Sequence, residues 1–203
     1  LLPSRDWKRA TRGLPWYPGD TVNIGIGQGD MLVTPLQLAT AVATLANRGK
    51  TVVPRMLKSG LELPEQAKAK QLDDVDQVPE QFWDLIFESM GMVVHRGNMG
   101  FGENGTAWAY IGRNIAYQMA GKSGTAQVVG IPQGEEYDEE ELAERHRKHA
   151  WFVAFAPIED PKIALAVLVE NGGGGSAVAS PVARKILDYY LLESRYKVAQ
   201  LDD

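Results

Sequence analysis

The chain has 203 residues with a net charge of -5, and 44% of its residues are hydrophobic, 23% are charged and none is cysteine. This length fits one large domain or two small ones and can bury a substantial core. The acidic balance argues against a general nucleic-acid binder, and the lack of cysteine excludes disulfides, thiolate metal sites and cysteine nucleophiles. The longest apolar run, 163–169, is far too short to cross a bilayer, so any membrane anchor would lie outside this sequence.

The first predicted element is a short extended segment, because Val22, Ile24 and Ile26 alternate along the chain. It runs into a glycine-rich turn over 25–29. A glycine-rich loop before a helix can bind phosphate, but this one lacks the full G-x-G-x-x-G spacing and the acidic residue that dinucleotide sites place about 20 residues later. A structural turn that leads into the next helix is the better interpretation.

The next predicted element is a helix with a strong start signal. Thr34 can cap its first turn, Pro35 suits the first helical position, and Gln37, three residues after the cap, completes a capping box. Apolar residues continue at helical spacing until the Asn-Arg-Gly sequence at 47–49 ends the helix.

The middle of the chain predicts a short strand over 51–53, a solvated polar segment over 62–77 and a second helix. Pro79 begins this helix, and His95 ends it, where a protonated imidazole would suit the helix dipole. A glycine- and asparagine-rich loop over 97–112 comes next. The apolar face of the helix is predicted to consist of Phe82, Ile86, Met90 and Val93.

The last third of the sequence predicts strand, loop, strand, turn, strand and helix. The runs 150–156 and 162–169 are apolar, and the proline-flanked residues between them predict a β-hairpin. Pro181 begins a closing helix after the tetraglycine at 172–175. The buried face of this helix is predicted to consist of Val182, Ile186 and Tyr189. Short turns between neighbours favour an antiparallel sheet flanked by helices, so the predicted fold class is α+β.

The stretch 117–129, YQMAGKSGTAQVV, holds the main chemical motif. Lys122 and Ser123 lie between two glycines, the second of which is Gly124, and Thr125 follows. Glycine in a strand-like run often marks the close approach of a ligand or another backbone. A flexible ammonium, two hydroxyls and bare backbone N–H groups suit an anionic group and a polarised carbonyl. Because strand alternation sends Lys122 and Ser123 to opposite faces, both border one cleft only if the strand's edge is exposed.

Histidines and acidic residues elsewhere give weaker signals. His146 and His149 are one helical turn apart, a spacing that can chelate zinc. No third ligand is obvious, so solvated histidines are favoured and neither a metal nor a cofactor is expected. The acidic run 135–144 follows the glycine-flanked strand and either overhangs the cleft or simply stays solvated, and the second interpretation is favoured.

The tetrapeptide Lys122-Ser123-Gly124-Thr125 matches the third signature of serine penicillin-recognising enzymes. Its context is more specific than the tetrapeptide itself. The sequences AGKSGTAQV, HAWFVAFAP and IALAVLVENGGGG, together with LLPSRDWK and WYPGDTVNIGIGQGDMLVTPLQLATAVATLANRG, resemble class B penicillin-binding proteins of the elongation type, the penicillin-binding protein 2 group. The resemblance covers nearly the whole chain and implies a penicillin-binding transpeptidase-like fold.

The resemblance also implies roles for these residues. Lys122 would support the proton network and the electrostatics of the cleft. The substrate-binding residues would be Lys122, Ser123, Gly124 and Thr125, with Ser123 and Thr125 binding the terminal carboxylate of a D-alanyl-D-alanine stem peptide. The backbone N–H of Thr125 would be one donor of the oxyanion hole.

The family also requires a nucleophilic serine with a lysine three residues later, and a serine-x-asparagine turn, both upstream of the motif. Neither is present there. Ser194 and Lys197 have the first spacing, but they follow the motif at the end of the terminal helix, which is the wrong context. The chain, 1–203, is therefore interpreted as the C-terminal portion of a single transpeptidase domain whose nucleophile-bearing half is absent, and we expect it to be inactive alone.

The function implied by the resemblance is that of a serine-type peptidoglycan D,D-transpeptidase, which acts through an acyl-serine intermediate in cell elongation and is inhibited by β-lactams. Expected partners are the peptidoglycan stem peptide, β-lactams, a membrane glycosyltransferase and elongation proteins, at the periplasmic face of the bacterial inner membrane. Two alternatives stay open. A D,D-carboxypeptidase or β-lactamase-like serine hydrolase would share residues 122–125, and a noncatalytic peptide-binding module would keep the strand without ever having had a nucleophile.

Overall fold

A three-stranded antiparallel sheet forms the centre of the computed structural model, which describes residues 1–55, 72–100, 102–130 and 142–193. Its order is β1-β2-β3, with β1 at Ala120–Ala126, β2 at His149–Ala156 and β3 at Ile163–Val169. The register places Lys122 opposite Val153 and Phe152 opposite Val167. The α+β class, the antiparallel sheet and the predicted hairpin are confirmed, although β3 begins one residue later than expected.

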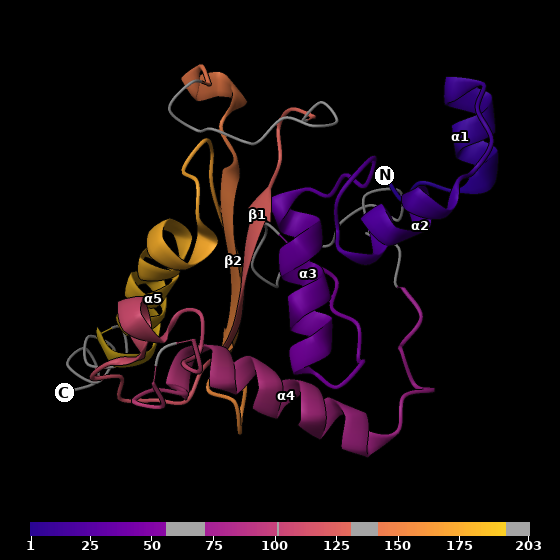
Figure 1. Cartoon of the computed structure of the whole chain (residues 1–203). Coiled ribbons are helices and arrows are strands. Elements are labelled where there is room, and N and C mark those ends of the chain that lie inside the picture. The colour runs from indigo at the N-terminus through magenta and orange to yellow at the C-terminus, as the bar shows by residue number, and fades with distance from the viewer. Residues whose placement is uncertain (56–71, 101, 131–141, 194–203) are drawn as a thin grey trace.

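The helices lie on both sides of the sheet and across one end of it (Figure 1). The α-helices are α1 (Arg5–Arg12), α2 (Pro18–Gly25), α3 (Pro35–Ala46), α4 (Glu80–His95) and α5 (Ser180–Asp188). Short helical segments are η2 (Trp108–Gly112), η3 (Glu144–His146), η4 (Gly175–Ala179) and η5 (Tyr189–Glu193). Side chains of β2 alternate between the two faces, so Phe152 and Ala154 join the core under α5, whereas Phe155 joins the core under α3 and α4.

The predicted extended segment around Val22 is wrong, because these residues lie in α2. A local signal outweighs the alternation of apolar residues. Pro18 occupies the first helical position, and the backbone N–H of Tyr17 donates to the Asp20 carboxylate at 2.7 Å. The glycine-rich sequence after α2 is the predicted turn, with Gly27 at a φ of 74°.

Helix α3 begins and ends where the sequence predicts. The Thr34 hydroxyl accepts from the Gln37 N–H at 3.2 Å, and the Gln37 side chain accepts from the Thr34 N–H at 2.9 Å. The strand predicted over 51–53 is absent from the described residues there. Thr51 instead donates its N–H to the Asp74 carboxylate at 2.8 Å, which replaces a ladder hydrogen bond. Most of the predicted polar segment, 62–71, lies outside the described residues.

The buried face of α4 is displaced by one residue from the predicted one. Phe82, expected in the core, is 47% exposed, whereas Trp83 and Phe87 are buried. Gly91 continues the buried face, and a Cβ there would lie 3.1 Å from Ile158 Cδ1, so a small residue permits the close approach of the loop after β2. The other three predicted residues, which flank this face and are partly buried, are Ile86, Met90 and Val93.

The buried face of α5 is also displaced by one residue from the predicted one. Val182 and Ile186 are exposed, as is Tyr189 just after the helix, while Ala183 and Leu187 are fully buried. Ala183 has a small side chain, which lets the helix pack closely. A search for large apolar residues at helical spacing does not find such a position.

Candidate active-site strand

Strand β1 carries the predicted motif on an exposed edge. Within the described part of the chain it pairs only with β2, so its other edge has no strand beside it. This meets the condition under which Lys122 and Ser123, on opposite faces, can border the same cleft.

Two hydrogen bonds show which backbone groups face this edge. The carbonyl of Thr125 accepts from the Gln28 side-chain amide at 3.0 Å, and the carbonyl of Ser123 accepts from the Lys122 ammonium at 2.6 Å. In an antiparallel pair a residue turns its N–H and C=O together, either toward the partner strand or away from it. Ser123 and Thr125 therefore also turn their N–H groups toward the open edge, and Gly124 turns its own toward β2.

The side chains of the motif are accessible. Lys122 and Thr125 are exposed and Ser123 is half-buried. The Ser123 hydroxyl lies 3.5 Å from the hydroxyl of Thr106, which comes from the loop before η2. A second hydroxyl thus adjoins the face of β1 that carries Ser123.

The glycines of the motif allow packing. A Cβ on Gly121 would lie 2.6 Å from the ring of Phe152. Gly175 at the start of η4 is equally constrained, because a Cβ there would lie 2.2 Å from the Trp151 carbonyl oxygen and 2.4 Å from that of Gly124. The close approach predicted from these glycines comes from the protein's own core and from η4.

His95 fixes the start of β1. Its Nε2 accepts from the Met119 N–H at 3.0 Å, one residue before the strand. Burial lowers the pKa of His95. The protonated imidazole expected at this helix end is therefore wrong, since an Nε2 that accepts a hydrogen bond carries no proton.

A polar network anchors the segment that leads into β1. The Tyr117 hydroxyl donates to Asp188 at 2.8 Å, and burial, followed by this contact, raises the pKa of Tyr117. Arg184 donates to the same carboxylate at 2.7 Å and to the carbonyls of Ile111 and Asn114 at 2.8 and 3.0 Å. Helix α5 thus ties the η2 region to the approach of the candidate strand.

Residues 4–188 match the family model described as the penicillin binding protein transpeptidase domain. The chain belongs to this family. It is 40% identical over 192 residues to the peptidoglycan D,D-transpeptidase MrdA of Haemophilus influenzae, and 39% identical over 193 residues to MrdA of Escherichia coli K12. Each match covers 94% of this chain but only 28% and 29% of those proteins, so the chain spans less than a third of these relatives.

Solved structures of penicillin-binding proteins share the fold. The Pseudomonas aeruginosa PBP2 structure in complex with WCK 5153 has a TM-score of 0.74 at 42% identity, covering 95% of this chain and 38% of that one. PBP2 of Helicobacter pylori in complex with MreC has a TM-score of 0.69 at 29% identity, covering 95% and 31%. The chain therefore has the architecture of part of a penicillin-binding transpeptidase domain.

The other candidate residues of this penicillin-binding family member do not converge on a site. His146 ends η3 and His149 begins β2, so the two do not share a helix. His146 accepts from Arg145 at 3.3 Å, and His149 Nδ1 accepts from the Asn171 N–H at 2.9 Å. Among the described residues no group of three potential metal ligands gathers. Ser194 and the acidic run up to 141 lie outside the described residues.

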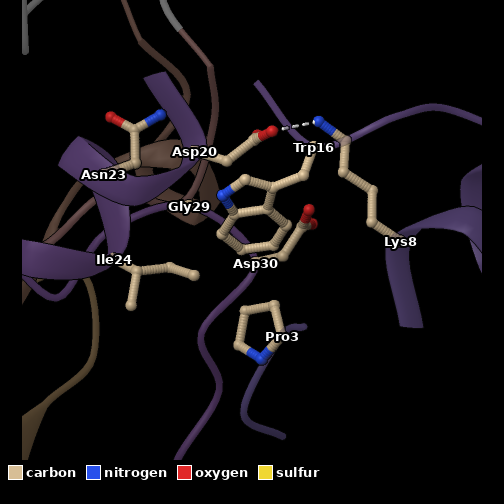
Figure 2. A pocket seen from close by; sticks show the side chains of 8 residues that line it. All are labelled: Pro3, Lys8, Trp16, Asp20, Asn23, Ile24, Gly29 and Asp30. Atoms are coloured by element: carbon tan, nitrogen blue, oxygen red, sulfur yellow. Dashed lines mark hydrogen bonds and ion pairs between the residues drawn. The ribbon is translucent and has the colours of Figure 1, made fainter. Parts of the chain in front are cut away.

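A pocket of about 140 Å³ near the N-terminus has no residue of β1 in its lining (Figure 2). Trp16 lies among its lining side chains, and both carboxylates are paired, Asp20 with Lys8 at 2.5 Å and Asp30 with Arg12 at 2.6 Å. The hydrogen bond from Lys8 lowers the pKa of Asp20. These ion pairs therefore link α1 to α2 and to the turn after α2, and neither carboxylate in the pocket lining is unpaired.

Sequence reasoning missed Thr106 and Gln28. Gln28 lies 97 residues before Thr125, and no pattern of spacing connects them. Thr106 had a weak signal, because it lies in the glycine-rich loop that precedes the strand. None of the described helices has the length and apolar character that a membrane crossing needs.

Proposed function

We propose that this chain supplies the substrate-binding strand of a peptidoglycan D,D-transpeptidase. The supporting observation is the open edge of β1, where the Lys122 ammonium donates to the outward-facing carbonyl of Ser123 and the Thr125 carbonyl also faces outward. In such a reaction a serine hydroxyl attacks the penultimate carbonyl of the stem peptide, the terminal D-alanine leaves with the proton, and an amine then takes the acyl group.

The roles follow from charge and backbone direction. Lys122 contributes to the proton network and attracts the anionic end of the stem peptide, with Ser123, Gly124 and Thr125 forming the binding strand. A hydrogen bond to a charged group contributes about 1.5–3 kcal/mol. The Thr125 N–H, which faces the open edge, is one donor to the oxyanion, and loss of one such donor costs about 2.7–4 kcal/mol in other hydrolases.

The nucleophile in this proposal belongs to a part of the transpeptidase domain outside the 203 residues. An exposed apolar surface on the first third of the chain supports this. Large side chains of α2, α3 and the turn between them point away from the core, although their type is usually buried. They are Val22, Ile26, Leu32, Val33 and Leu36.

The proposed partners and location follow the relatives. PBPA of Mycobacterium tuberculosis, 33% identical over 83% of this chain, has been solved as a penicillin G acyl-enzyme complex. PBP2 of Helicobacter pylori has been solved in complex with MreC. We extend this to β-lactam inhibition, to elongation proteins and a membrane glycosyltransferase as partners, and to the periplasmic face of the inner membrane.

A fluorescent penicillin tests the proposal directly. The full-length protein should form a covalent adduct, whereas the 203 residues alone should not. Lys122→Ala should abolish the labelling with an almost unchanged melting temperature, because Lys122 is exposed, and Lys185→Ala on the exposed face of α5 is the matched control. Wild-type acylation kinetics in the Lys122 variant would refute its role.

Product analysis separates the proposal from its alternatives. With a stem peptide and an amine acceptor, a transpeptidase yields the cross-linked product and a carboxypeptidase only the shortened peptide. A full-length protein without an S-x-x-K motif upstream of Leu1 would instead be a noncatalytic binding module.

A further inference from the structure

Gln28 lies in a tight turn after α2, and its side chain contacts β1. It lies between Gly27 and Gly29, whose φ angles are 74° and 78°, a region that other residues rarely adopt. Its own backbone N–H donates to the Asn23 carbonyl at 2.8 Å, which closes the turn at the end of α2. The turn therefore has a fixed backbone from which the Gln28 side chain extends.

The burial pattern of this turn is the reverse of the usual one. Ile26 is 70% exposed, whereas the polar side chain of Gln28 is half-buried against the sheet. A carboxamide that turns inward needs a partner, and Gln28 has one in the Thr125 carbonyl at 3.0 Å.

The contact between Gln28 and Thr125 lies near the C-terminal end of β1. Thr125 is one residue from the end of the strand at Ala126, and its carbonyl faces away from β2. Strand ends separate from their neighbours most easily. Because Gln28 holds the carbonyl, the N–H of Thr125 keeps its direction, and the second lone pair of the carbonyl stays available to another donor.

We propose that Gln28 is a positioning residue for the acyl-transfer reaction: through its hydrogen bond to the Thr125 carbonyl, it holds the oxyanion-binding end of β1 in the reactive geometry. The inference rests on the proposed function. Only the NH₂ group of the Gln28 carboxamide can make this hydrogen bond, since the Thr125 carbonyl can accept but not donate.

The test is the rate of acylation of the full-length protein by a fluorescent penicillin, measured from pH 8 to pH 4 and compared with the wild type at each pH. Gln28→Ala removes the donor, and Gln28→Glu keeps the shape but has no donor while it is ionised. At pH 8 both variants should acylate about five- to tenfold more slowly than the wild type, as expected for one neutral hydrogen bond. At pH 4, just below the ordinary glutamate pKa of about 4.3, Gln28→Glu should move toward the wild-type rate, because a protonated carboxyl can donate, and Gln28→Ala should not.

Gln81→Glu on the exposed face of α4 is the matched control and should follow the wild type at every pH. The inference is overturned if both Gln28 variants acylate like the wild type, or if Gln28→Glu stays as slow as Gln28→Ala at pH 4. A wild-type protein that forms no adduct at all would overturn the proposed function itself, which distinguishes the two failures.

Discussion

The sheet and the first third of the chain are stabilised by different interactions. In the sheet, Phe152 and Phe155 have no exposed surface. In the first third, α3 packs on the core through Val42 and Ala46, but α1 and α2 bury no apolar residue, and the structure there depends on capping and on ion pairs such as Lys8 with Asp20. Burial of apolar area contributes more free energy than a few ion pairs at or near the surface, so the sheet should unfold last.

The largest effect should come from the sheet core. Phe152→Ala leaves a cavity between β2 and the neighbouring strand residue Gly121, whose missing side chain makes room for the ring. We expect the free energy of unfolding to fall by about 3–5 kcal/mol. Chemical denaturation measures this, and a fall below 1 kcal/mol would show that the sheet is not the stable centre.

A smaller loss is expected where α5 is tied to the approach of β1. Arg184→Ala removes the donor to the carbonyls of Ile111 and Asn114 and to Asp188. Hydrogen bonds to a charged group contribute about 1.5–3 kcal/mol, and because these partners are partly buried or exposed we expect a loss of about 2 kcal/mol in total. The same denaturation experiment on Lys185→Ala, an exposed neighbour, provides the baseline.

The third prediction concerns pH and the start of β1. The folded-state pKa of His95 is lowered by burial, so the neutral form stabilises the fold above the unfolded pKa of about 6.5. This contribution is lost as the pH falls through the folded pKa. The free energy of unfolding should therefore differ less between pH 7.5 and pH 5 in His95→Gln than in the wild type. An equal pH dependence of the two proteins would contradict the neutral, hydrogen-bond-accepting state assigned to His95.

The smallest effect should come from the exposed apolar surface. Ile26→Ser should change the free energy of unfolding of this chain by less than about 0.5 kcal/mol. In the full-length protein the same change should cost more, if the remainder of the transpeptidase domain covers Ile26. Hydrogen exchange of residues 18–25 in both contexts measures the protection, and equal exchange would remove the case for a covered surface.

Local signals predicted most of the fold. The capping box of Thr34 and Gln37 involves residues three apart, so α3 could be placed accurately, and the hairpin of β2 and β3 has a proline at each end of its turn. The helix faces were displaced by one residue because small residues, Ala183 on α5 and Gly91 on α4, belong to the buried faces, and a search for large apolar residues does not find them. Large side chains such as Val182 point outward.

The candidate site could be predicted only within one strand. Residues 122–125 adjoin one another, and their chemistry is visible in the sequence, whereas Gln28 and Thr106 reach β1 only after the chain has folded back on itself. The direction of the Thr125 carbonyl depends on which edge of β1 is paired, and no local pattern contains that information.

The open edge of β1 has a further consequence for the behaviour of the protein in solution. An unpaired edge is a template on which a second copy of a chain can add a strand, and natural sheets prevent this with short edge strands and lysine side chains. β1 is short, and Lys122 and Gln28 already occupy two of its outward carbonyls, those of Ser123 and Thr125. The groups proposed to attract and orient a substrate would thus also protect the chain against edge-to-edge aggregation, so that a variant without them would lose solubility before it lost its fold.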